Sequence, residues 1–165
     1  MIPHPDHNVI AINCAVITVS DTRTVETDKS GQVIQQLLEN KGHKILEYAI
    51  VKDELEQIRA TLNQLDTNSK LQAIIVNGGT GIAPRDTTFD VISSLLTKTI
   101  PGFGEIFRYL SYQEIGSRAI ASRAVAGVKN NKLIFSLPGS SNAVKLAMNE
   151  LILPELNHLV KQINS

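Results

Sequence analysis

The 165-residue sequence contains one cysteine and no tryptophan, and aromatic residues make up only 4% of it. One cysteine cannot form an intrachain disulfide, which excludes a disulfide-stapled scaffold and predicts a cytoplasmic protein. Cys14 lies in an apolar run, where we expect a small buried residue. Lys and Arg together number 16, and Asp and Glu together also number 16. No net charge therefore favours nucleic acid or an anionic membrane as a partner.

Long apolar runs are also missing. No stretch approaches the ~18 apolar residues of a membrane span, so we expect no membrane partner. The run at residues 9–19 is unlike a signal-peptide core, because Asn13 interrupts it and a polar turn follows in place of a cleavage site. We therefore expect a first strand at residues 10–19. The length suits one domain, which we expect over residues 1–165 with a flexible tail at 1–8.

Two common phosphate-binding motifs are absent as well. No Gly-Lys-Ser/Thr occurs, which excludes a P-loop. The glycine pattern that begins at Gly79 continues through Gly81 but reaches Pro84, where a dinucleotide-binding fingerprint requires a third glycine. Any phosphate site in this chain therefore has a different construction.

The most informative segment is a glycine-rich turn that follows an apolar run at residues 73–76, which lacks polar alternation and predicts a strand buried on both faces. Apolar residues after Asp86 recur at helical spacing, so the turn joins a strand to a helix, where open α/β sheets bind phosphorylated ligands. Glycine lets backbone N–H groups approach such a ligand. The alternative is that glycine serves only the backbone angles, with Asp86 as a helix N-cap. The turn consists of Gly78, Gly79, Thr80 and Gly81.

The first half of the chain alternates strands with helices. We expect a helix with Ser30 as its N-cap, ended by a left-handed residue at Gly42. A strand at residues 44–51 and a helix that starts at Asp53 follow. This β-α-β-α-β order predicts right-handed crossovers and a mostly parallel sheet.

The second half departs from that order. Pro101, Gly102 and Gly104 precede a predicted helix. Strand-like runs at 124–128 and 133–137 are separated by four polar residues, which predicts an antiparallel hairpin within the sheet. Pro154 should kink or divide the last helix. The predicted fold class is therefore α/β, with a mostly parallel sheet and one antiparallel hairpin.

Several polar turns are predicted to meet at one edge of this sheet, and two carboxylates, Asp53 and Asp86, follow predicted strands there. Acids beside phosphate-binding turns repel the ligand unless a cation lies between them, and Mg²⁺ is the usual bridge. The alternative for Asp53 is a variant of the capping box with Glu56. The turns contain Ser20, Asp21, Ser30, Gly31, the glycine-rich turn at 78–81, Pro138, Gly139 and Ser140.

Two arginines in this part of the sequence, Arg85 and Arg123, have the chemistry to neutralise a phosphate. An isolated arginine is more often part of a surface ion pair, and both roles stay open from the sequence. Arg123 is included among the candidate ligand-binding residues.

Together these segments resemble molybdopterin-binding domains of the MoaB/MogA type, related to the G domain of gephyrin, over about residues 11–159. Pro-Gly-Ser stands where other members have Pro-Gly-Asn-Pro, and with residues 102–105 and 107–111 this favours the B branch of the family. The matching segments are residues 18–21, 28–31, 50–54, 78–81 with 85–86, 122–127 and 137–140.

The resemblance implies a three-layer α/β/α subunit, a trimer or a trimer-based hexamer, and a role in molybdenum cofactor synthesis beside other proteins of that pathway. Active relatives transfer AMP from Mg-ATP to the terminal phosphate of molybdopterin and release pyrophosphate. Their catalytic acids match Asp53 and Asp86, and a pterin-phosphate contact matches Ser122. The family asparagine falls at Ser140.

Two functions follow as hypotheses. The first is an adenylyltransferase in which Asp53 and Asp86 bind Mg²⁺, the glycine-rich and Pro-Gly-Ser turns bind phosphate, and Ser20, Asp21 and Ser122 bind pterin or nucleotide. The second is a noncatalytic carrier that binds molybdopterin and presents it to another enzyme. Which turn binds which ligand does not follow from the sequence.

Overall fold

The computed structural model describes residues 9–165, and the tail predicted at residues 1–8 lies outside them. The described chain forms one six-stranded sheet with helices on both faces. The strands are β1 (Asn13–Val19), β2 (Lys44–Val51), β3 (Ala73–Asn77), β4 (Lys98–Thr99), β5 (Val125–Lys129) and β6 (Lys132–Leu137). The helices are α1 (Lys29–Asn40), α2 (Leu55–Asp66), α3 (Thr88–Leu95), α4 (Pro101–Ile115), α5 (Ser141–Ala147) and α6 (Leu153–Ile163), with a 3₁₀ turn at Gly116–Ala121 and a π turn at Met148–Ile152.

The strand order is β2-β1-β3-β6-β5-β4. The first four are mutually parallel, as predicted, and β5 runs antiparallel to both of its neighbours. The β5–β6 hairpin is confirmed, and its turn places Asn130 and Asn131 at positive φ, the geometry of a tight hairpin turn. Strand β4 was not predicted, because two exposed residues carry no alternating pattern.

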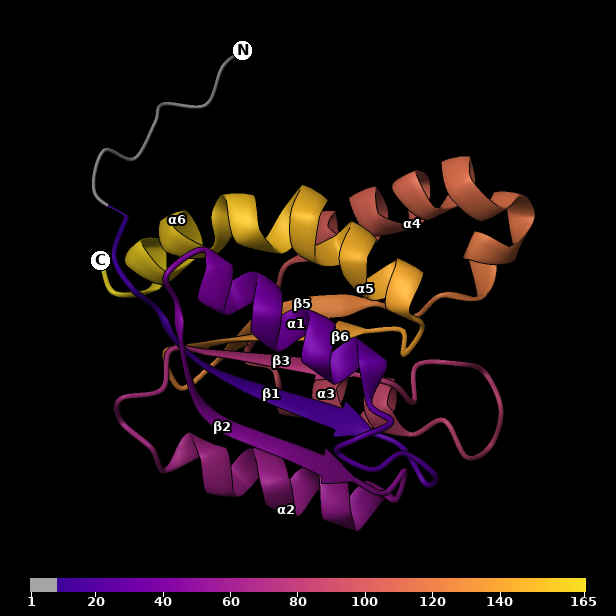
Figure 1. Ribbon diagram of the computed structural model, residues 1–165, viewed down its shortest axis with the longest axis horizontal. Helices are drawn as coiled ribbons and strands as arrows, with labels where there is room; N and C mark the ends of the chain where they lie inside the picture. The colour runs from indigo at the N-terminus through magenta and orange to yellow at the C-terminus, as the bar shows by residue number, and fades with distance from the viewer. Residues whose placement is uncertain (1–8) are drawn as a thin grey trace.

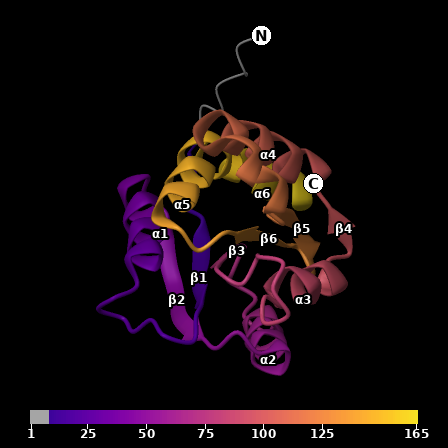
Figure 2. The same ribbon diagram turned by 90° about the vertical axis from the view of Figure 1, so that its right-hand side faces the viewer.

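Two apolar clusters separate the layers (Figures 1 and 2). Helices α1, α4, α5 and α6 cover one face of the sheet, and α2 and α3 cover the other. Strand β3 is buried along its whole length, which confirms the prediction from its apolar run. Cys14 is also fully buried, and burial raises the pKa of its thiol to about 12. The expected three-layer α/β/α architecture is therefore present.

Several helix starts differ from the sequence prediction. Asp28, not Ser30, is the N-cap of α1, and its carboxylate accepts the N–H of Gly31 at 3.0 Å. The caps of α2 and α3 are Glu54 and Thr87, so neither Asp53 nor Asp86 caps a helix. Helix α4 already begins at Pro101, since proline is favoured in a first helical turn.

The first strand begins at Asn13, later than predicted, whereas Gly42 has the left-handed φ of +81° that was expected after α1. At Pro154 the last helix divides as predicted. The N–H of Leu153 bonds to the carbonyl of Met148 in a π turn, because proline cannot continue an α-helical ladder. No helix among residues 9–165 has the length and apolarity needed to cross a membrane.

The carboxyl ends of β1, β3 and β6 lie side by side, with Thr18 opposite Asn77 and Asn77 opposite Leu137. The chain moves outward from β1 to β2 and then returns to β3 on the other side. Helix α1 and helix α2 consequently lie on opposite faces of the sheet. Such a reversal opens a crevice beyond the strand ends, and ligands of open α/β sheets bind there.

Buried His43 generates a prediction for the pH dependence of stability. Its Nδ1 accepts the N–H of Ile12 at 3.1 Å, and burial lowers the pKa of the imidazole. The imidazole of His43 binds a proton more tightly in the unfolded chain than in the folded protein. The stability that neutral His43 contributes is therefore complete above the pKa of the unfolded state, and it is lost as pH falls through the pKa of the folded state. The melting temperature should therefore fall between about pH 7.5 and pH 5.5, above the range where carboxylates titrate. In His43→Gln the fall should be smaller, and an equal fall would contradict this role.

Candidate active site

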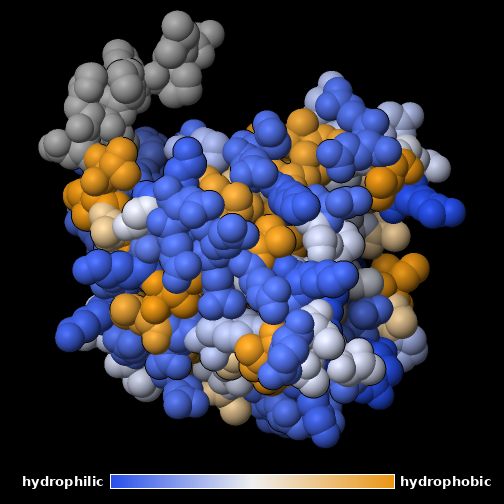
Figure 3. Space-filling model, viewed as in Figure 1, coloured by the Kyte–Doolittle hydropathy of each residue, from blue (hydrophilic) through white to orange (hydrophobic). Residues whose placement is uncertain are grey.

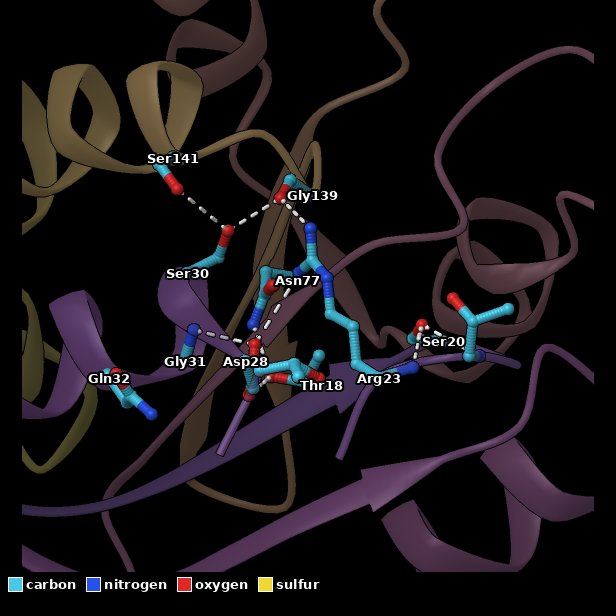
Figure 4. A network of polar contacts seen from close by, with 12 residues as sticks. Thr18, Ser20, Arg23, Asp28, Ser30, Gly31, Gln32, Asn77, Gly139 and Ser141 are labelled. Atoms are coloured by element: carbon cyan, nitrogen blue, oxygen red, sulfur yellow. Dashed lines mark hydrogen bonds and ion pairs between the residues drawn. The ribbon is translucent and has the colours of Figure 1, made fainter. Parts of the chain in front are cut away.

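The predicted polar turns do meet at this edge of the sheet (Figure 4). The hydroxyl of Ser30 donates to the carbonyl of Gly139 at 2.6 Å. The N–H of Gly78 donates to the carbonyl of Leu137 at 2.9 Å, which joins the ends of β3 and β6. A Cβ added to Gly139 would lie 3.2 Å from the Cα of Gly78. Segments far apart in the sequence thus form one small-residue surface.

The glycine-rich turn is tightly packed against the protein. Gly78 and Gly79 have φ values of +98° and +66°. A Cβ on Gly78 would overlap the carbonyl of Val19, and one on Gly79 would overlap the hydroxyl of Thr88. The sequence suggested that glycine keeps space open for a ligand, but at these two positions backbone angle and packing already require it.

Asp53 is fixed by the residues that start α3. Its Oδ1 accepts the backbone N–H of Thr87 at 3.2 Å and the hydroxyl of Thr87 at 3.0 Å. Its Oδ2 lies 2.8 Å from the position that a Cβ on Gly79 would occupy. None of the described residues donates to Oδ2, so one carboxylate oxygen beside the glycine-rich turn is left for a ligand.

Asp86 closes the other end of the same turn. Its Oδ2 accepts the N–H of Ala83 at 2.9 Å and lies 2.5 Å from the Cβ position of Gly81. Within residues 9–165 its Oδ1 has no hydrogen-bond donor. Both predicted acids therefore contact the glycine-rich turn, and each has one oxygen that the protein does not use.

Arg123 holds the carboxyl-terminal end of the glycine-rich turn through backbone carbonyls. Its guanidinium donates to the carbonyl of Gly81 at 2.6 and 2.9 Å and to the carbonyl of Asp86 at 3.0 Å. It also pairs with Asp90 at 3.1 Å and lies over the ring of Phe89, 4.8 Å from its centroid. These contacts occupy its donors on the protein, so the structure gives Arg123 a positioning role. A phosphate contact for it stays a prediction.

Arg85 forms an ion pair with Asp21 across the mouth of the site. Asp21 also accepts the backbone N–H of Asp53 at 3.1 Å. That hydrogen bond, followed by the nearby Arg85, lowers the pKa of the Asp21 carboxyl. The pair joins the turn after β1 to the turn after β3.

The remaining predicted residues have varied surroundings. The hydroxyl of Ser122 is buried and has no partner among the described residues. Thr80 is buried, Pro138 is half-buried and Ser140 is exposed. Ser140 is the N-cap of α5, and its hydroxyl accepts the N–H of Ala143 at 3.3 Å. Among these residues, Ser122 therefore has a buried hydroxyl without a hydrogen-bond partner. Its role as a ligand contact stays a prediction.

Sequence reasoning missed a buried network centred on Asp28 (Figure 4). Asp28 is fully buried, and it accepts the hydroxyls of Thr18 at 2.6 Å and Tyr48 at 2.5 Å. Burial and the hydrogen bond to this carboxylate raise the pKa of Tyr48. The side chain of Asn77 donates to Thr18 at 2.9 Å. The signal available in the sequence was Asp28 at a favourable capping position, but its partner on β2 is visible only in three dimensions.

The donor set fits Mg²⁺ only when a phosphate completes it. Asp53 and Asp86 offer one unused oxygen each, and Mg²⁺ typically takes one or two carboxylates together with substrate phosphates and water. No group of three His, Cys, Asp or Glu side chains suited to a metal exists in residues 9–165. The two acids therefore suit a cation that arrives with a phosphate ligand.

The packing of the glycine-rich turn predicts unequal costs for two Gly→Ala changes. Gly79→Ala combines a positive φ with overlap at Thr88, and should lower the free energy of unfolding by about 2–5 kcal/mol. Gly42→Ala is the matched control, because φ there is +81° but nothing lies within 4 Å of the added Cβ, and only about 1–2 kcal/mol should be lost. Urea unfolding measures both. Equal losses would show that the turn is not packed as described.

The sequence and the fold have counterparts among known proteins. A family described as "probable molybdopterin binding domain" matches residues 15–158. A molybdenum cofactor biosynthesis protein B from Halalkalibacterium halodurans is 56% identical over 92% of this chain and 90% of its own length. Its counterpart from Bacillus subtilis has the same identity and coverage.

Solved structures of related proteins have the same fold. A crystal structure of a molybdenum cofactor biosynthesis protein B superposes with a TM-score of 0.91 at 49% identity, covering 94% of this chain and 97% of the other. The tungsten cofactor synthesizing protein MoaB from Pyrococcus furiosus gives 0.86 at 34% identity, with 96% and 100% covered. The chain therefore belongs to the MoaB/MogA family of molybdopterin-binding domains, in the branch of molybdenum cofactor biosynthesis protein B.

Proposed function

We propose that this protein takes part in molybdenum cofactor biosynthesis by binding molybdopterin and transferring AMP from Mg-ATP to its terminal phosphate, with release of pyrophosphate. The described domain would be the subunit of a cytoplasmic homo-oligomer. Its partners would be the two substrates and other proteins of the same pathway.

One observation carries this proposal. Asp53 and Asp86 each place one unused carboxylate oxygen beside the glycine-rich turn, and each uses its second oxygen to accept backbone N–H groups. Carboxylates fixed in this way do not have to reorganise when a cation arrives with its phosphates. A protein that only carried a pterin would have no need for two fixed acids beside a phosphate-binding turn.

In the proposed reaction, an oxygen of the terminal phosphate of molybdopterin attacks the α-phosphorus of ATP. A new P–O bond forms, the P–O bond to the pyrophosphate breaks, and pyrophosphate leaves with the electron pair. The second pKa of a phosphate monoester is about 6, so the nucleophile is already largely ionised near pH 7 and needs no general base. The structure describes two histidines, His43 before β2 and His158 on α6. Both lie toward the end of the sheet opposite the proposed site.

The protein's part is to bind and orient. Positioning and charge neutralisation dominate phosphoryl transfer. Asp53 and Asp86 would bind Mg²⁺, which supplies charge neutralisation on the nucleotide phosphates when it is bound. Thr87 and Ala83 fix those carboxylates, and Arg123 fixes the turn between them.

Substitution of the acids tests the proposal. Asp53→Asn should keep the acceptor for Thr87 and melt close to wild type, yet lower the rate of pyrophosphate release roughly 10²–10³-fold, the usual loss when one electrostatic group is removed. Asp86→Asn should behave in the same way. Glu54→Gln is the control, because it removes a neighbouring charge from a side chain that contacts Gln57, and turnover should stay unchanged.

Single-turnover measurements on the same preparations decide the outcome. Wild-type rates in both Asn variants would remove the proposed role of the acids. A wild type that binds molybdopterin but never releases pyrophosphate would favour the carrier function instead.

An apolar surface supports self-association. Helix α4 buries Phe103 and Phe107 but exposes other large side chains, and orange groups lie over the region of α4 in Figure 3. Exposed large apolar side chains concentrated on one element suit an interface, and the family resemblance implies a trimer or a trimer-based hexamer. The exposed large apolar residues of α4 and the following 3₁₀ turn are Ile106, Tyr109, Tyr112, Ile115 and Ile120, the last 84% exposed.

Light scattering coupled to size-exclusion chromatography tests this surface. The wild type should elute as a trimer or a multiple of it, and Ile115→Lys with Ile120→Lys should shift it towards the monomer, because burying unpaired charges opposes association. Leu55→Lys is the control, since Leu55 is exposed on α2, on the other face of the sheet. A monomeric wild type, or an unchanged mass in the double variant, would contradict this interface.

A further inference from the structure

Arg23 was not among the residues predicted for the site, yet it points into it (Figure 4). The hydroxyl of Ser20 accepts the backbone N–H groups of Thr22 at 3.2 Å and Arg23 at 3.1 Å, which fixes the turn after β1. From this turn the side chain of Arg23 reaches the Pro-Gly-Ser turn, where Nη2 donates to the carbonyl of Gly139 at 2.8 Å. The guanidinium thus lies where the ends of β1, β3 and β6 meet.

The other two arginines of this edge are less suited to an anion inside the site. Arg123 donates through all three of its nitrogen atoms to Gly81, Asp86 and Asp90. Arg85 is paired with Asp21 and is largely exposed. Of these three arginines, Arg23 is therefore the partly buried one that still has donors for an anion entering the crevice.

Arg23 keeps donors available. A guanidinium has five N–H groups, and the described residues accept two of those on Arg23, which leaves three. Its side chain is 30% exposed, so part of it is open to a ligand. A partly buried guanidinium with unused donors is well suited to phosphate, which it can bind through two parallel hydrogen bonds.

Asp28 balances Arg23 only in part. The contact from Nη1 of Arg23 to Asp28 is 3.5 Å long, whereas the same carboxylate accepts three shorter hydrogen bonds, from Thr18, Tyr48 and Gly31. Asp28 therefore orients the guanidinium through one long contact, while the N–H groups that no residue accepts remain for an incoming anion.

We infer that Arg23 binds a phosphate group of the substrates at the junction of the glycine-rich and Pro-Gly-Ser turns, with Asp28 and Tyr48 as its positioning residues. This inference rests on the proposed function, because it assumes substrates that carry phosphate. The phosphate belongs either to molybdopterin or to the nucleotide, and the shared chemistry is a phosphate oxyanion.

Equilibrium binding without turnover separates this inference from the proposed reaction. Mg-ATP is titrated in the absence of molybdopterin, and molybdopterin in the absence of ATP, so a protein that never released pyrophosphate would still give an answer. Arg23→Gln removes the charge and leaves a shorter polar side chain in place. It should lower the affinity for one of the two ligands roughly ten-fold or more, as expected for the loss of a charge-assisted hydrogen bond. The ligand that loses affinity identifies the phosphate.

Two controls distinguish charge from structure. Lys41→Gln removes one positive charge from an exposed position at the end of α1, away from this edge of the sheet, and should leave both affinities unchanged. Wild-type affinity should weaken as salt rises, and this dependence should be flatter in Arg23→Gln, an effect that a merely structural role would not produce. If Arg23→Gln binds both ligands as the wild type does, or if the wild type binds neither, the inference is overturned.

Discussion

The site depends on the close approach of three strand ends. The carbonyl of Val19 at the end of β1 leaves no room for a side chain on Gly78, and Gly78 in turn lies against Gly139 after β6. The positive φ values at Gly78 and Gly79 then turn the chain back over β3 towards α3. Because of this packing, polar groups from four separate segments reach one small surface, and loss of the close approach would separate them.

Charge at this surface is arranged in fixed pairs. Thr87 and Ala83 hold one oxygen of each catalytic candidate, so the second oxygen of Asp53 and of Asp86 is presented in a defined place. Backbone carbonyls and acids fix the arginines in the same way. Under the proposed function, a cation would meet the acids, and a phosphate of one of the two substrates would meet the free guanidinium donors of Arg23.

The order of strands and helices could be predicted from the sequence because buried strands and amphipathic helices have distinct periodicities. The caps could not. Asp28 and Ser30 are both good capping residues, and the tertiary bonds from Tyr48 to Asp28 and from Ser30 to Gly139 decide which of them caps α1. Arg23 was missed for the same reason, since its partner Gly139 is 116 residues away in the chain. Asp53 and Asp86 could be singled out as candidates because each directly follows a recognisable strand or turn.

The most direct test of the account is steady-state pyrophosphate release by the wild-type protein. If Asp53 and Asp86 serve adenylyl transfer, release should require Mg²⁺, ATP and molybdopterin together, and should continue well beyond one equivalent of protein. Saturable binding of molybdopterin with no release of pyrophosphate under the same conditions would contradict the account.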